Sequence, residues 1–106
     1  MPKKLTDNER KIKNILIKEY GPIKRIVLFG SRARGKSDEY SDWDLAIIKN
    51  TKKRFVERLG KLPPLPFKTD IFVYTPEEFA TMQRNQNPFI MEMLKSGKVI
   101  YEASTN

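Results

Sequence analysis

Four short apolar runs, separated by helix and turn signals, constrain the fold of this chain more than any other feature of its sequence. They cover residues 23–29, 43–48, 70–74 and 98–101. Each run is rich in β-branched and aromatic residues and is too short for a buried helix, so we expect four strands. Helical patterns precede, separate and follow them. The sequence therefore predicts an α/β (α+β) fold, a small mixed β-sheet with helices packed on it.

Helix start signals are equally clear. The spacing of apolar residues predicts helices over residues 6–20, about 51–60, 75–84 and 88–96. Thr6 and Thr75 are each followed three residues later by an acid, Glu9 and Glu78, which is the pattern of a capping box. Residues 62–66 contain three prolines, which predicts an extended loop.

Size and composition exclude several classes of site. The chain has 106 residues, enough for one domain but not for two independent cores, so we treat residues 1–106 as a single domain. Because it contains no cysteine and no histidine, disulfides, thiolate metal sites and histidine bases are excluded. Catalysis would have to use carboxylates, hydroxyls, Lys, Arg or an oxygen-ligated metal such as Mg²⁺. With no membrane-length apolar run and no signal peptide, we expect a cytoplasmic protein with no membrane association.

The net charge of +8 is unevenly distributed along the chain. Residues 1–68 carry 18 Lys and Arg against 8 Asp and Glu, whereas residues 69–106 carry 3 against 5. A basic segment of this kind favours a polyanionic partner, such as nucleotide phosphates, nucleic acid or an acidic protein surface. Scattered lysines that keep a small protein in solution explain the same counts, so charge alone does not choose.

Three carboxylates fall at the starts of predicted strands. Asp42 and Asp44 are two residues apart at the start of the second strand, so their side chains should project from one face while Trp43 packs on the other. Asp70 begins the third strand. If these strands are neighbours, the three carboxylates converge and need a cation such as Mg²⁺ to offset their repulsion. An isolated Asp-x-Asp pair is more often a solvated strand end.

A turn suited to phosphate lies just before that pair. Gly30 and Ser31 directly follow the first strand, in the segment Gly30-Ser31-Arg32-Ala33-Arg34-Gly35. Glycine lets the backbone approach a ligand closely, and the turn can present N–H groups and the Ser31 hydroxyl to an anion. Arg32 and Arg34 add cations suited to phosphate oxygens. A phosphate turn that is followed by three carboxylates at strand starts is stronger evidence for a site than the turn or the carboxylates alone.

Taken together, these segments resemble a known family. Residues 30–35, then Ser41-Asp42-Trp43-Asp44-Leu45, then Thr69-Asp70-Ile71 are similar to the signature of the DNA polymerase β-type nucleotidyltransferases, and the small size matches their minimal nucleotidyltransferase subgroup. The resemblance implies a polymerase β-like nucleotidyltransferase fold, with ATP as substrate and two Mg²⁺ ions as cofactors.

The resemblance also implies a role for each motif residue. Gly30 and Ser31 would hold the β- and γ-phosphates of the nucleoside triphosphate. Asp42 and Asp44 would bind the two Mg²⁺ ions. Asp70 would bind the catalytic ion and help to deprotonate the attacking hydroxyl. Such a site needs no histidine, which agrees with the composition.

The two arginines of the turn are assigned less firmly by this resemblance. Arg32 and Arg34 occupy motif positions at which family members vary, although both could contact phosphate. Arg34 could equally pair with a nearby acid, Asp38 or Glu39.

The resemblance extends to a partner. In the minimal subgroup the enzyme is paired with a helical toxin of the HEPN type, and it acts as the antitoxin by attaching AMP to a tyrosine of that toxin. About 35 residues follow Asp70, too few for a nucleic-acid clamp or a drug-binding domain, which favours a protein acceptor. The nearly all-apolar segment 88–94 is compatible with a protein interface, and equally with packing on the sheet.

Other functions stay open at this point. The chain could be an antitoxin that neutralises its partner by binding alone, with an inactive site. It could be a nucleotidyltransferase that acts on a small molecule or on RNA. A nucleic-acid-binding module would use the basic segment, but the aromatic residues Phe29, Trp43, Phe55 and Phe67 lie mostly within apolar runs, which argues against a base-stacking platform.

Overall fold

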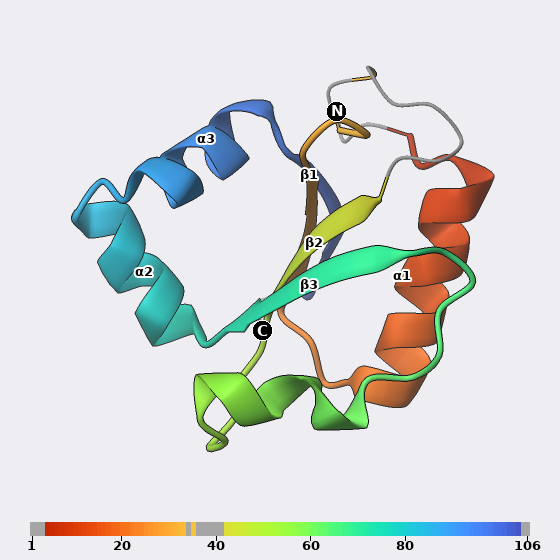
Figure 1. The fold of residues 1–106 in the computed structure, drawn as a ribbon, viewed down its shortest axis with the longest axis horizontal. Coiled ribbons are helices and arrows are strands. Elements are labelled where there is room, and N and C mark those ends of the chain that lie inside the picture. Colours follow the sequence, from red (N-terminus) through yellow and green to blue (C-terminus); the bar gives the residue numbers. More distant parts are fainter. Residues whose placement is uncertain (1–3, 34, 36–41, 105–106) are drawn as a thin grey trace.

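A single four-stranded sheet lies between helices on its two faces (Figure 1). The structure, a computed structural model, describes residues 4–33, 35 and 42–104. Its elements are α1 (Asp7–Tyr20), β1 (Arg25–Phe29), β2 (Trp43–Ile48), the 3₁₀ helix η1 (Phe55–Lys61), β3 (Thr69–Tyr74), α2 (Pro76–Arg84), α3 (Pro88–Ser96) and β4 (Lys98–Glu102). The expected α/β fold class is confirmed. None of the helices in the described part of the chain has the length and apolar character needed to cross a bilayer.

The sheet is mixed, with the strand order β3-β2-β1-β4. Strand β1 pairs antiparallel with both β2 and β4, whereas β2 and β3 run parallel. The start of β2 and the start of β3 therefore lie at the same end of the sheet, next to the end of β1. All three predicted motifs meet at this end.

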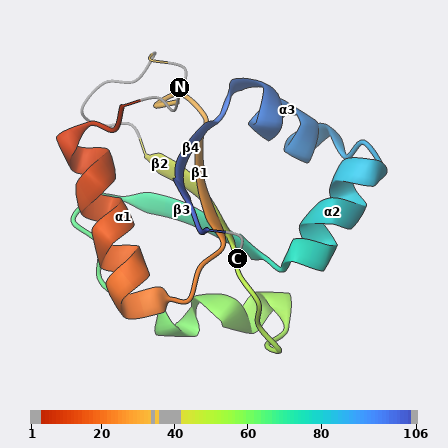
Figure 2. The same ribbon diagram turned by 180° about the vertical axis from the view of Figure 1, so that it is seen from behind.

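Two apolar cores hold the helices on the sheet. The first, on the α1 face, is built around Ile12, Leu16, Tyr20, Ile26, Leu28, Trp43, Leu45 and Ile47. The second, on the α2 and α3 face, is built around Val27, Ala46, Ile48, Phe79, Ile90 and Met93. Figure 2 shows the same arrangement from behind, with α1 and the α2–α3 pair on opposite sides of the strands. The alternation predicted for β2 is confirmed, since Trp43 and Leu45 face α1.

The helix caps form as the sequence predicts. The Thr6 hydroxyl accepts the Glu9 backbone N–H at 3.1 Å, and the Glu9 carboxylate in turn accepts from the Thr6 backbone N–H. Thr75 and Glu78 form the same reciprocal pair at the start of α2. These bonds satisfy backbone donors that a helix start leaves without partners, which fixes the first turn of each helix.

The helix predicted over residues 51–60 is wrong in type and in position. The segment forms the 3₁₀ helix η1, which begins only at Phe55. Its apolar side chains face outward, with Val56 81% exposed, while Arg58 is 6% exposed. The guanidinium of Arg58 donates to the Val73 carbonyl oxygen and to both carboxylate oxygens of Glu78, so a charged side chain, not an apolar one, attaches η1 to the sheet.

Candidate active site

Asp44 and Asp70 lie side by side at the motif-bearing end of the sheet. They are register partners in the parallel β2–β3 pair, whose strands in such a sheet are about 4.8 Å apart. Neighbouring residues Trp43, Leu45 and Ile71 contact the core on the α1 face, so alternation places both carboxylates on the opposite face. Asp70 is exposed and Asp44 half-buried. The second and third strands are neighbours, which is the condition on which convergence of the carboxylates depends.

Asp42 immediately precedes β2 and is half-buried. Its carboxylate lies 4.0 Å from the ammonium group of Lys68, on the segment that leads into β3. Among the described residues, no group of three or more His, Cys, Asp or Glu side chains is gathered as metal ligands. The fold thus brings Asp44 and Asp70 together, with Asp42 two residues away and paired to Lys68.

Gly30 lies directly against the Asp44 carboxylate. Its φ of +77° is one that residues with a side chain rarely adopt. A Cβ atom built on Gly30 would also come within 2.1 Å of Asp44 Oδ2. Only glycine allows the turn to pass this close to the carboxylate. The predicted phosphate turn is therefore in immediate contact with one predicted metal ligand, Asp44, and half-buried Ser31 is next in the chain.

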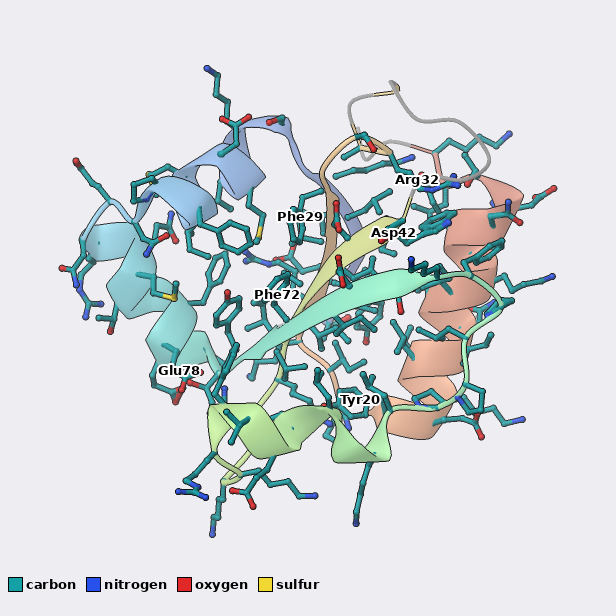
Figure 3. All side chains as sticks on the ribbon, viewed as in Figure 1. Tyr20, Phe29, Arg32, Asp42, Phe72 and Glu78 are labelled. Carbon is teal, nitrogen blue, oxygen red and sulfur yellow. The ribbon has the colours of Figure 1, made fainter. Side chains whose placement is uncertain are left out.

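Arg32 lies on the α1 side of the sheet end. Its guanidinium carbon is 4.6 Å from the centroid of the Trp43 ring, a cation–π contact, and Trp43 in turn stacks on Phe67 at 5.0 Å between centroids. Figure 3 shows Arg32 near α1, and Asp42 beside the start of β2. A phosphate contact by Arg32 stays a prediction. Arg34 and its predicted partners Asp38 and Glu39 lie outside the described residues.

Three phenylalanines, which the sequence analysis did not select as site residues, lie on the carboxylate face. Phe29 is the cross-strand partner of Asp44, and Phe72 follows Asp70 by two residues. The ring of Phe89, from α3, is 5.4 Å from both other ring centroids. Strand alternation could have placed Phe29 and Phe72 on this face, but no sequence signal brings α3 over them. Figure 3 shows Phe29 and Phe72 on the side of the sheet that faces α2 and α3.

With this geometry established, comparison with known proteins assigns the chain to a family. The family described as Polymerase beta, Nucleotidyltransferase matches residues 10–106, a range that contains every candidate site residue. The chain belongs to this nucleotidyltransferase family. The resemblance inferred from the three motifs is confirmed.

A curated relative and two solved structures agree with this assignment. The relative, from Methanocaldococcus jannaschii and named "Putative protein adenylyltransferase MJ1305", is 35% identical in an alignment 89 residues long, and the match covers 73% of this chain. The chain spans 57% of that relative's length, little more than half.

Both structures come from toxin–antitoxin pairs. One is a toxin–antitoxin with AMP-PNP, at a TM-score of 0.54 and 19% identity, covering 92% of this chain and 75% of the other. The second is a mutant of the toxin–antitoxin MntA-HpeT, at a TM-score of 0.53 and 16% identity, covering 91% and 74%. At such identities the likeness shows the nucleotidyltransferase fold.

Proposed function

We propose that this nucleotidyltransferase transfers AMP from ATP to a hydroxyl group of a partner protein, a tyrosine of a HEPN-type toxin, and so acts as the antitoxin. The observation that carries the proposal is the contact between the Gly30 turn and Asp44, with Asp70 beside it in register. A phosphate-binding turn next to paired carboxylates is what nucleotidyl transfer requires. The adenylyltransferase name of the relative and the toxin–antitoxin neighbours support the acceptor class.

The residues at this end of the sheet fit Mg²⁺ as cofactor. Asp42, Asp44 and Asp70 would supply oxygen ligands, the type that Mg²⁺ prefers, and Asp42 already has a cation, Lys68, 4.0 Å away. When bound, Mg²⁺ offsets the negative charge of the carboxylates and of the triphosphate. The Gly30–Ser31 turn would bind the β- and γ-phosphates through backbone N–H groups and the Ser31 hydroxyl.

The transfer is a single displacement at phosphorus. The acceptor hydroxyl oxygen forms a bond to the α-phosphorus, and the bond between that phosphorus and the oxygen bridging to the β-phosphate breaks. Pyrophosphate leaves, and the hydroxyl proton passes to the Asp70 carboxylate and then to water. The chain itself contributes position and charge, not a covalent intermediate.

Transfer of label tests this function. The protein is incubated with Mg²⁺, α-labelled ATP and the protein encoded by the neighbouring gene, and label is followed on a denaturing gel. We expect label on the partner from the wild type and none from the Asp42→Asn/Asp44→Asn variant. The matched control is Glu77→Gln/Glu92→Gln, which removes the same charge from exposed positions on α2 and α3 and should label normally.

The same experiment distinguishes the alternative of neutralisation by binding. A partner that is bound and silenced without label, by wild type and double variant alike, would overturn the transfer reaction and favour occlusion. Label on RNA or on a small molecule, with none on the partner, would overturn the protein acceptor alone. Mass spectrometry of a labelled partner identifies the modified residue.

A further inference from the structure

The aromatic cluster of Phe29, Phe72 and Phe89 lies on the same sheet face as the paired carboxylates. Phe29 and Phe72 come from β1 and β3, on either side of β2, and Phe89 comes from the first turn of α3. On β2 between them is Ala46, the register partner of Phe72 and fully buried. A small residue at the centre leaves room for the Phe89 ring to pack over the sheet.

Packing against the other two rings buries only part of the Phe89 side chain. Its ring meets Phe29 at 89° and Phe72 at 64°, both edge-to-face arrangements. Even so, Phe89 stays 41% exposed, while Ile90 beside it is fully buried. A large apolar side chain fixed by two rings, yet open to solvent beside a reaction centre, is a surface on which a ligand ring can pack.

The order of the strands gives the two sides of this cluster different neighbours, with Phe29 next to the phosphate turn and Phe72 on the Asp70 side. The predicted phosphate turn lies at the end of β1, Asp44 on β2, and Asp70 on β3, in a row across the sheet. In a displacement at phosphorus the entering oxygen and the leaving pyrophosphate lie on opposite sides. Pyrophosphate held at Gly30 and Ser31 thus places the acceptor on the β3 side, where Phe72 follows Asp70 by two residues, about 6.6 Å of strand.

We propose that Phe89, held in place by Phe29 and Phe72, forms the surface on which an aromatic ring of the acceptor packs while its hydroxyl reaches Asp70. Phe89 would then select a phenolic hydroxyl over an aliphatic one. This inference rests on the proposed function, because it assigns the acceptor side of the same reaction. The phenolic oxygen would be the entering atom in the displacement at the α-phosphorus, and pyrophosphate would leave.

Binding of a small phenol tests the surface without requiring turnover. N-acetyltyrosinamide is titrated into the AMP-PNP-bound protein with Mg²⁺, and the methyl signals of Ile90 and Met91 are followed by NMR. We expect Phe89→Ala to weaken this binding by about tenfold and Phe89→Tyr to restore it. Leu94→Ala is the matched control, since Leu94 is 38% exposed on the same helix, and it should bind as the wild type does. AMP-PNP affinity should stay unchanged in all three variants.

Each contrary result overturns the proposal in a recognisable way. Equal binding of N-acetyltyrosinamide by Phe89→Ala and wild type would mean that Phe89 only packs. Weaker AMP-PNP binding by Phe89→Ala, with the phenol unaffected, would assign the ring to the nucleobase. Kinetics on the labelled partner add a second readout, in which Phe89→Ala should raise KM for the partner and leave KM for ATP unchanged. Wild type that binds the phenol but transfers no label would overturn the proposed function and leave the surface standing.

Discussion

At the scale of single residues, Gly30 determines how close the phosphate turn comes to Asp44. Both its positive φ and the space occupied by Asp44 Oδ2 require that position 30 lack a side chain. Gly35 provides a natural comparison, because its φ is +71° but a Cβ built there would meet nothing within 4 Å. Comparison of Gly30 with Gly35 therefore distinguishes the effect of a left-handed backbone from the effect of contact with the Asp44 carboxylate.

Substitution of the two glycines by alanine should therefore affect stability alike and activity differently. We expect Gly30→Ala and Gly35→Ala each to lower the free energy of unfolding by about 1–2 kcal/mol, the cost of a left-handed backbone. Only Gly30→Ala displaces the Asp44 carboxylate, and a shift of that kind should reduce label transfer by about 100-fold. Urea unfolding and the labelling assay measure the two effects. Equal activities of the two variants would contradict the close contact.

Residue-level prediction from the sequence was strongest where a motif coincided with a strand end. Strand signals and alternation place Gly30 at the end of one strand and Asp44 and Asp70 at the starts of two others, whereas the pairing of those two strands is observed only in the structure. The approach of α3, which brings Phe89 over the carboxylate face, depends on packing between segments distant in sequence. Likewise, motif spacing does not encode that Arg32 lies against the Trp43 ring, on the α1 side of the sheet.

At the scale of elements, η1 shows where local pattern fails. The caps of α1 and α2 use residues three apart, so the sequence displays them directly. The attachment of η1 depends on Arg58 and Glu78, which are 20 residues apart. Hydrogen bonding to Arg58 lowers the pKa of Glu78, which favours the charged form of its carboxylate. The spacing of apolar residues in this segment predicts a buried helix face. It cannot reveal that a buried arginine, and not that apolar face, attaches the segment to the sheet.

Loss of this arginine should release η1 from the sheet. Arg58→Ala removes hydrogen bonds to the carbonyl oxygens of Lys53 and Val73 and to Glu78, and should lower the free energy of unfolding by about 2–4 kcal/mol. Arg54→Ala is the control, because its ion pair with Glu57 is exposed and should contribute less than about 0.5 kcal/mol. Chemical denaturation compares the two. Similar losses would show that burial of Arg58 adds nothing.

At the scale of the whole molecule, the two apolar cores share one sheet. Alternate residues of β1 and β2 enter opposite cores, as Leu45 and Ala46 do. If the helices on one face came off the sheet, the strands that also line the other core would lose their cover on that face. We therefore expect the described domain to unfold as one cooperative unit.

A substitution in the core that does not contain Trp43 tests this cooperativity. Met93, on α3 and 2% exposed, belongs to the core on the sheet face opposite Trp43. Met93→Ala should lower the free energy of unfolding by about 2–5 kcal/mol. Trp43 fluorescence and far-UV circular dichroism should report the same shifted midpoint in urea. Separate midpoints would mean that the two faces unfold independently.

The pairing of β1 with β4 also bears on how the chain is made. It joins Arg25 to Glu102, 77 residues apart, by strand pairing and by an ion pair of 2.9 Å. A ribosome adds about 5–20 residues per second, so β4 is synthesised several seconds after β1. During that interval β1, which has a neighbour on both sides in the finished sheet, is an edge strand open to pairing with other chains. The nascent protein is thus most exposed to aggregation in the seconds before residues 98–102 emerge.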